Sequence, residues 1–315
     1  MRRALIVGID HYENTPLQGC VNDASYITEV LAKNQDGSPN FSCKKLISTE
    51  EQITRARLRE NLKELFEHKS DVALFYFAGH GMIGKFGGYL VTQDFKENDE
   101  GVAMLDVLSL ANQSKIDEVI IILDCCHSGA FGVIPALQTE LAYLREEISV
   151  LCASRLLQAA VEKDGGGIFT ALICAGLNGG AADLIGNVTV GSLYAFVDKA
   201  LGPWNQRPLF KSHVSRLLPI RKCDPAFELS VLRLLTDYFK NPDDQFYLDP
   251  SYEPGAEPRH KEHAKIFGHL QRYRGARLLV PVGERNLYYA TINSKSCQLT
   301  DLGRYYWKLV KEGMI

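Results

Sequence analysis

The sequence lacks any long apolar run, and it carries little net charge. No stretch approaches the ~20 apolar residues that a membrane-spanning helix needs. The short apolar run that follows Arg2 and Arg3 ends at Asp10, too early for the core of a secretion signal. The formal net charge of −3 gives no basic field for nucleic-acid binding. We therefore expect a cytoplasmic protein without a membrane or nucleic-acid partner.

Cysteine pairs with the spacing of a metal site are also absent. The eight cysteines are scattered, and several lie inside apolar runs, which is typical of buried thiols in a reducing compartment. A structural zinc site needs two pairs such as C-x₂₋₄-C, and a redox pair usually reads C-x-x-C. The adjacent Cys125 and Cys126 fit neither pattern. We therefore predict no metal ion or other cofactor.

Apolar runs alternate with helical patterns as far as about residue 200, which favours an α/β domain with a mostly parallel sheet. The runs are nearly continuous in apolar character, as expected when helices cover both faces of the sheet. The predicted strands are 3–9, 43–48, 71–79, 119–124 and 148–154, and the predicted helices are 20–34, 54–68, 167–180 and 189–201.

The pattern changes around "RKCDPAF" (221–227), so we predict one domain over 1–222 and a small second domain over 223–315. A β-hairpin after helices suggests a winged-helix-like α+β module. Its predicted helices are 225–239, 259–274 and 300–310, and its predicted strands are 276–282 and 287–300.

Two predicted strands end in residues that carry chemistry. "FYFAGHGM" ends with His80 between two glycines, and "IIILDCCHSG" ends with the cysteine pair. Sites form at the carboxyl ends of strands in α/β sheets, so neighbouring strands would bring a thiol and an imidazole together. Such a pair can make a thiolate nucleophile, with the Gly81 N–H as an oxyanion donor. The alternative is a buried thiol that only ends a strand.

These residues resemble the histidine and cysteine boxes of the caspase/metacaspase superfamily, whose metacaspase form reads D-S-C-H-S-G. The resemblance covers about residues 3–220 and makes Cys126 the nucleophile, 46 residues after His80. "LQGCVNDA" (17–24) is similar to the motif whose aspartate, here Asp23, lines the pocket for the residue before the cut bond (P1). The resemblance also implies pocket roles for Asp124 and Ser154. Two pocket carboxylates would select arginine or lysine at P1.

The resemblance implies a caspase-like fold and a cysteine endopeptidase, regulated as an effector of bacterial stress or antiviral defence. The second domain would sense a partner protein or a nucleotide-derived signal. Calcium activates some relatives, but no acidic run with EF-hand spacing is present. Self-cleavage would use Arg145, the one basic residue of 130–147, or Lys163.

Three alternatives stay open. The chain could be a non-catalytic scaffold with this fold, or a transcriptional regulator built on the winged helix. Asp23 could simply cap or salt-bridge the helix that follows "GCVND". The basic stretch 259–277 favours an anionic ligand, but residues 224–315 carry 13 basic and 12 acidic residues, which is weak support for a DNA reader.

Overall fold

The computed structural model of the 315-residue chain describes residues 1–84, 87–97, 99–125, 143–153, 162–163, 166–202, 207–226, 228–258 and 260–315. The chain divides into two compact units, Met1–Cys223 and Asp224–Ile315. The division lies at the change of sequence pattern around residues 221–227. Each unit is described by itself.

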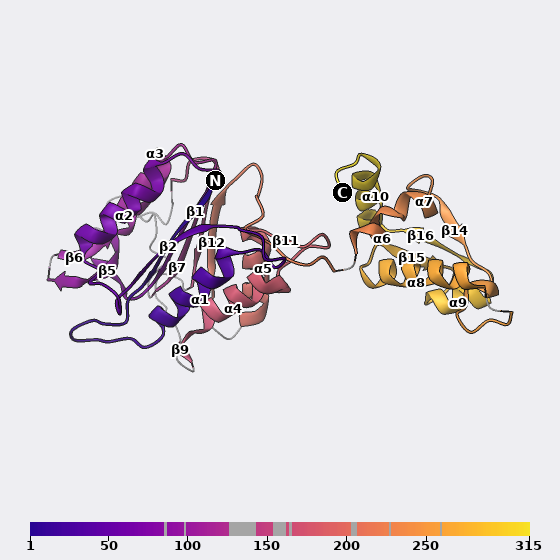
Figure 1. The fold of residues 1–315 in the computed structure, drawn as a ribbon, viewed down its shortest axis with the longest axis horizontal. Coiled ribbons are helices and arrows are strands. Elements are labelled where there is room, and N and C mark those ends of the chain that lie inside the picture. The colour runs from indigo at the N-terminus through magenta and orange to yellow at the C-terminus, as the bar shows by residue number, and fades with distance from the viewer. Residues whose placement is uncertain are drawn as a thin grey trace. The chain divides into compact units, whose positions relative to one another are not determined.

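The first unit is built on a six-stranded sheet with the order β12-β8-β7-β3-β1-β2 (Figure 1). All neighbouring strands are parallel except β12, which pairs antiparallel with β8. The strands are β1 (Arg2–Gly8), β2 (Ser42–Ile47), β3 (Val72–Ala78), β7 (Glu118–Asp124), β8 (Ile148–Cys152) and β12 (Leu209–His213). The five predicted core strands are therefore confirmed, and the fold is the predicted α/β class.

Helices cover both faces of this sheet, which explains why the strands are apolar throughout. Successive side chains of β1 alternate between the faces: Leu5 and Val7 pack on one side, Ala4 and Ile6 on the other. Each large buried side chain contributes about 1.5–3 kcal/mol to folding. The first face is covered by α2 (Arg55–Glu67) and α3 (Met104–Gln113), and the second by α1 (Cys20–Ala32), α4 (Ile168–Ala175) and α5 (Val190–Leu201).

Local signals in the sequence set where two of these helices begin. The Thr54 side chain accepts a hydrogen bond from the Arg57 N–H at the start of α2. Thr189 and Ser192 form a reciprocal capping box at the start of α5. Each such cap stabilises a helix by about 1 kcal/mol because it satisfies an N–H group that has no partner within the helix.

A small antiparallel sheet follows His80, and the sequence did not predict it. It has the order β4-β5-β6 and is formed by β4 (Gly81–Gly84), β5 (Gly87–Lys96) and β6 (Asp99–Ala103). Two further two-stranded ribbons are formed by β9 (Glu162–Lys163) with β10 (Gly166–Gly167) and by β11 (Asn187–Val188) with β13 (Arg221–Lys222). A π-helical turn, η3 (Gly176–Gly180), follows α4. The β4-β5-β6 sheet matters for function because its first strand continues directly from His80.

The second unit combines helices with a three-stranded antiparallel sheet of order β14-β16-β15. Its core includes Phe267, Leu270 and Tyr273 of the long helix α8, which matches the predicted helix 259–274. Its elements are α6 (Leu229–Arg233), α7 (Leu235–Tyr238), β14 (Gln245–Tyr247), a 3₁₀ turn η4 (Pro250–Tyr252), α8 (Lys261–Gly275), β15 (Leu279–Val282), α9 (Leu287–Ile292), β16 (Ser296–Leu299) and α10 (Asp301–Lys311).

Two of the predictions for this unit were wrong. The predicted strand 287–300 begins as the helix α9, because Leu287, Ala290 and Thr291 are buried at helical spacing. The Asn286 side chain caps this helix by accepting from the Tyr289 N–H at 2.9 Å. The predicted helix 225–239 is two short helices, α6 and α7. The winged-helix character of the unit stays a prediction.

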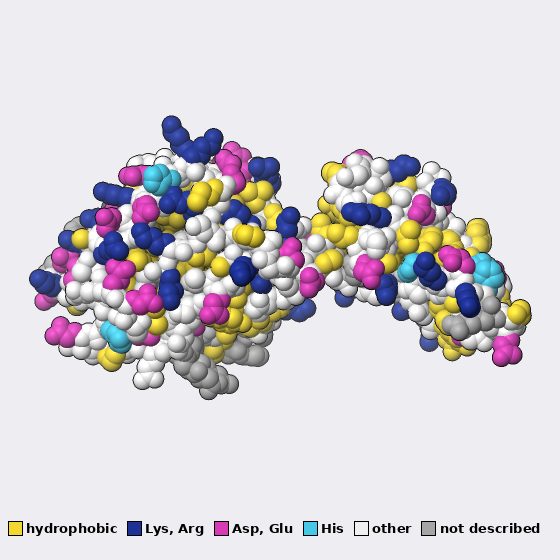
Figure 2. Space-filling view, in the orientation of Figure 1, with side chains coloured by type: hydrophobic (Ala, Val, Ile, Leu, Met, Phe, Trp, Pro, Cys, Tyr) yellow, Lys and Arg dark blue, Asp and Glu magenta, His cyan; other side chains and the backbone are white. Residues whose placement is uncertain are grey.

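Among the described residues, no helix is long and apolar enough to span a bilayer. Basic and acidic side chains are interspersed over the visible face of the first unit (Figure 2). The face therefore has no large area of one sign of charge.

Candidate active site

The strand that precedes His80 and the strand that precedes the cysteine pair are direct neighbours in the sheet. β3 and β7 run parallel, and Ala78 lies opposite Asp124 at their carboxyl ends. The residues that follow each strand therefore leave the sheet at the same edge. Cys125 follows β7 and is 1% exposed within the apolar cluster under α2 and α3. Cys126 and Ser154 lie outside the described residues, so their predicted roles stay predictions.

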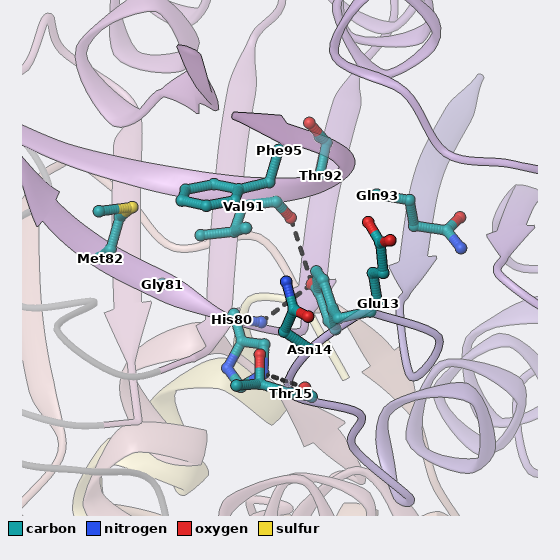
Figure 3. Close-up of a pocket in the computed structure, with 11 residues that line it drawn as sticks. Glu13, Asn14, Thr15, His80, Gly81, Met82, Val91, Thr92, Gln93 and Phe95 are labelled. Carbon is teal, nitrogen blue, oxygen red and sulfur yellow. Dashed lines mark hydrogen bonds between the residues drawn. The ribbon is translucent and has the colours of Figure 1, made fainter. Parts of the chain in front are cut away.

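His80 leaves this edge half-buried, and a main-chain carbonyl fixes its ring. Its Nε2 lies 2.7 Å from the carbonyl oxygen of Thr15 (Figure 3). A carbonyl oxygen only accepts hydrogen bonds, so Nε2 must carry a proton. In the neutral imidazole, Nδ1 then keeps the lone pair that can accept a proton from a thiol.

Tyr12 holds the backbone on both sides of this ring. Its hydroxyl accepts from the His80 N–H at 3.0 Å and donates to the Val91 carbonyl at 3.2 Å (Figure 3). The Tyr12 and His80 rings also contact each other, with centroids 4.6 Å apart. Burial raises the pKa of Tyr12 well above its usual value, so the phenol keeps the proton it donates. A methyl group at Gly79 would lie 2.6 Å from the Tyr12 hydroxyl, so this position requires glycine.

Two carboxylates converge beside the end of β7. Asp23, in the first turn of α1, accepts from the Gly167 N–H through Oδ2 at 2.8 Å. Asp124 accepts from the Thr170 hydroxyl through Oδ2 at 2.6 Å. A methyl group added to Gly167 would lie 2.5 Å from Asp124 Oδ2 and 3.0 Å from Asp23 Oδ2. Only glycine fits between them, and it brings the start of α4 against both carboxylates.

These carboxylates are buried and connect to a further polar pair. Asp23 is 9% exposed and Asp124 is 7% exposed. The Thr170 hydroxyl that binds Asp124 also lies 2.6 Å from the Tyr76 hydroxyl. Burial raises the pKa of Tyr76 well above its usual value, and the charges of Asp124 and Asp23 raise it further. Negative charge is therefore concentrated at this point of the sheet edge.

The Asp10 side chain binds the first N–H groups of α1. The Asp10 carboxylate accepts from the Cys20 N–H at 2.8 Å and from the Val21 N–H at 3.2 Å. Asp10 follows β1, so this contact ties the β1–α1 loop to the start of α1. The Asp23 carboxylate also accepts from the Gly167 N–H, outside its own helix, so Asp23 does more than cap or salt-bridge α1, and its pocket role stays a prediction.

Sequence reasoning missed three contributors to the site: Tyr12, Thr15 and Thr170. A usable signal existed for the first two, because "DHYENT" (10–15) follows β1, another parallel strand that ends at this edge. No signal in the sequence distinguishes Thr170 from any other threonine near the start of a helix.

A pocket of about 400 Å³ opens beside His80 (Figure 3). Its walls come from the β1–α1 loop, from the first residues of β4 and from β5. Its lining residues are Tyr12, Glu13, Asn14, Thr15, His80, Gly81, Met82, Val91, Thr92, Gln93 and Phe95. Within the described part of the chain, no cluster of three or more His, Cys, Asp or Glu side chains is arranged to hold a metal ion.

Arg145, one of the two candidate self-cleavage positions, has its side chain bound at the end of α3. Its guanidinium donates to the carbonyls of Ala111 at 3.2 Å and Ile116 at 2.7 Å. Burial lowers the pKa of the guanidinium, but no side chain of this kind loses its charge in a protein. Cleavage after Arg145 would require these bonds to break. Lys163 lies in the β9–β10 ribbon.

Comparison with known proteins gives one family, and the similar solved structures include the two described next. The family described as Caspase domain matches residues 1–219. A Geobacter sulfurreducens protein of known crystal structure is 14% identical, with a TM-score of 0.53 over 71% of this chain and 97% of that chain. Caspase-1 from Spodoptera frugiperda is also 14% identical, with a TM-score of 0.48 over 70% of this chain and 92% of that chain. Among curated proteins the comparison finds no match.

Proposed function

Because the chain belongs to the caspase-domain family, whose members are cysteine peptidases, we propose that it is an endopeptidase that cleaves proteins after arginine or lysine. The observation that carries the proposal is the meeting of two buried carboxylates, Asp23 and Asp124, at the strand end that precedes the cysteine pair. The fixed orientation of His80 at the end of the neighbouring strand supports it further.

In the proposed reaction, Cys126 and His80 act as a nucleophile and its base. His80 Nδ1 takes the Cys126 thiol proton, and the sulfur attacks the carbonyl carbon of the scissile peptide. The Gly81 and Cys126 N–H groups stabilise the oxyanion that forms. His80 then gives its proton to the departing amine as the C–N bond breaks. A thioester remains, and water hydrolyses it to release the acid and the thiol.

The basic P1 preference follows from electrostatics. Asp23 and Asp124 place two buried carboxylates beside each other, and this arrangement favours a ligand that brings positive charge. An arginine side chain fits best, because its planar fork of donors can bind both carboxylates at once. In this proposal Ser154 lies beside the same pocket.

A peptide-library cleavage profile tests this proposal. Wild type should cut after Arg or Lys, Cys126→Ala should be inactive, and Cys125→Ala should stay active because Cys125 belongs to the core. Asp23→Asn keeps the size of the side chain and should lower kcat/KM for basic P1 substrates on the order of 30-fold, the effect of removing one charge from a buried pair. Asp71→Asn is the matched control, since it removes one charge at the opposite end of β3.

The proposal fails if no peptide is cut and a basic chloromethylketone does not label Cys126 under any activating condition. That result would favour the non-catalytic scaffold. Cleavage that ignores P1 charge would reject the pocket role of Asp23 and Asp124 while leaving the peptidase intact.

We further propose that Asp224–Ile315 regulates the peptidase, as an effector of bacterial stress or antiviral defence would require. The support is chemical: Lys261, Lys265 and Arg272 are exposed along one side of α8, where a phosphate-bearing signal or an acidic partner would bind. Loss of activation on deleting 224–315 would support this role, and unchanged constitutive cleavage would contradict it.

A further inference from the structure

The pocket beside His80 has no part in the P1 recognition described above. It lies on the other side of the sheet edge from the two carboxylates. Tyr12, in its wall, belongs to the apolar cluster under α2 and α3. Asp23 and Gly167 lie at α1 and the start of α4, which cover the opposite face. His80 therefore lies at the edge between the two buried carboxylates and a mostly apolar pocket.

Its walls are mostly apolar, and its rim carries an acid. Met82, Val91 and Phe95 line it (Figure 3), and so does Tyr12. Glu13 is exposed in its lining. At about 400 Å³ the pocket falls in the size range of small-ligand sites and has room for a large side chain. An apolar wall with an acidic rim attracts apolar groups and repels carboxylates.

The chemistry of the proposed reaction fixes which part of a substrate meets this pocket. The histidine must deliver its proton to the departing amine, so that nitrogen comes within hydrogen-bond reach of His80. The residue that bears this amine is the one directly after the cut bond, P1′. Its side chain therefore lies within a few ångströms of His80, which lines the pocket.

The geometry of an extended peptide gives the same assignment. Successive side chains of an extended chain point to opposite sides. If the P1 side chain enters between Asp23 and Asp124 on the α1 and α4 side, the P1′ side chain points to the α2 and α3 side. The pocket lies on that side.

We propose that this pocket is the S1′ subsite and that it selects a large apolar residue, such as Phe, Leu or Met, after the basic P1. The inference rests on the proposed function. The pocket is also tied to the base: the Tyr12 hydroxyl binds both the His80 N–H and the carbonyl of Val91, a pocket residue. A side chain that fills the pocket therefore packs against the group that holds His80.

Peptides with a constant basic P1 and a varied P1′ test the inference on the full chain. Large apolar P1′ residues should raise kcat/KM on the order of tenfold over Gly and still further over Asp. Phe95→Ala should remove much of this preference, because it takes away an apolar wall. Ile83→Ala is the matched control: Ile83 is 42% exposed on the neighbouring β4, outside the pocket, and its truncation should change nothing.

A second measurement needs no turnover. Dipeptide amides such as Phe-Ala-NH₂ mimic the leaving group, and ¹³C-methyl NMR of the four methionines reports where they bind. The Met82 methyl should shift with Phe-Ala-NH₂ and not with Asp-Ala-NH₂. Met104, buried away from the pocket, and the exposed Met314 should stay unchanged.

A flat P1′ profile in an enzyme that cuts after Arg or Lys would overturn the S1′ assignment and leave the proposed function standing. So would equal Met82 shifts with both dipeptides, or no shift at all. Absence of both peptide cleavage and Cys126 labelling would instead reject the proposed function, and the subsite with it.

Discussion

A single hydrogen bond determines which nitrogen of His80 can act as a base. The Thr15 carbonyl requires a proton on Nε2, so the lone pair is on Nδ1. The same contact stabilises the imidazolium after Nδ1 has taken a second proton, because Nε2–H still points at the carbonyl oxygen. The same hydrogen bond therefore holds the ring in one orientation in both protonation states. A group that first accepts a proton and then returns it needs such an orientation.

Tyr12 is a positioning residue, and Tyr12→Phe tests it. Without the hydroxyl, the His80 N–H and the Val91 carbonyl lose their shared partner. We expect kcat to fall on the order of tenfold, because small displacements of a base are costly, with KM and P1 preference nearly unchanged. Steady-state kinetics that separate kcat from KM would measure this.

The control for this prediction is Tyr26→Phe. The Tyr26 ring is 46% exposed, and its hydroxyl accepts a hydrogen bond from the Asn178 side-chain amide at 3.2 Å. Its removal should leave the kinetics unchanged. Equal kinetics for Tyr12→Phe and wild type would show that Tyr12 serves only the fold.

At the scale of elements, β7 carries a buried carboxylate at each end. Asp124 ends the strand at the site, and Glu118 begins it at the opposite edge, 1% exposed. Burial is the main cause that raises the pKa of Glu118 to about 7, against a hydrogen bond from the Leu218 N–H that lowers it. One strand thus carries a buried carboxylate at the site and another at the opposite edge of the sheet.

The raised pKa predicts that stability falls as pH rises. The folded protein binds the Glu118 proton more tightly than the unfolded chain does, so the stabilisation is complete below the ordinary glutamate pKa and is lost as pH rises through about 7. The free energy of unfolding of Glu118→Gln should therefore exceed that of wild type by about 2 kcal/mol at about pH 8 and nearly equal it at about pH 5. Urea unfolding at the two pH values measures this.

Glu60→Gln serves as the comparison, because the Glu60 carboxylate is 70% exposed. It should show no such pH-dependent gain. A Glu118→Gln variant whose stability runs parallel to wild type across this range would contradict the assignment.

How far the sequence predicted these elements depends on where the stabilising contacts lie. The strands β1, β3 and β7 were predictable because burial on both faces leaves continuous apolar runs. The β4-β5-β6 sheet was not, because its pairing depends on contacts between segments and its glycines resemble turn residues. The helix α9 was misread because its tyrosines favour strands, while burial at helical spacing decided the outcome.

The candidate site was predictable to a similar degree. His80, Asp23 and Asp124 come from motifs within single segments, and the structure brings the carboxylates together and His80 to the neighbouring strand end. Thr15 acts through its main chain, and Thr170 acts through a contact between distant segments. The place of Thr15 after β1 was a usable signal although its residue type was not, whereas nothing in the sequence marks Thr170.

At the scale of the whole molecule, each unit buries aromatic side chains of its own. Phe75 and Phe77 lie in the first, and Phe239, Phe267 and Tyr273 in the second. A unit with its own core can fold alone. We therefore expect residues 1–223 and 224–315, produced separately, each to unfold cooperatively, and the full chain to show both transitions in urea monitored by circular dichroism.

If either fragment lacks a cooperative transition while the full chain unfolds in a single step, the two units depend on each other for stability. The result bears on regulation, because a unit that folds alone can be removed without destroying the peptidase. The deletion test of the regulatory proposal depends on this point.

The contact between His80 and the Thr15 carbonyl determines which kinds of mutation in this loop inactivate the protein. Every amino acid supplies the same main-chain carbonyl, so no missense change at position 15 deletes the group that orients the ring. What places this oxygen is the path of residues 9–19, anchored where Asp10 binds the start of α1. Single-codon insertions and deletions in this segment should therefore inactivate the protein far more often than substitutions at Thr15. A deep mutational scan of this loop should therefore show that its length is essential although any amino acid is tolerated at position 15.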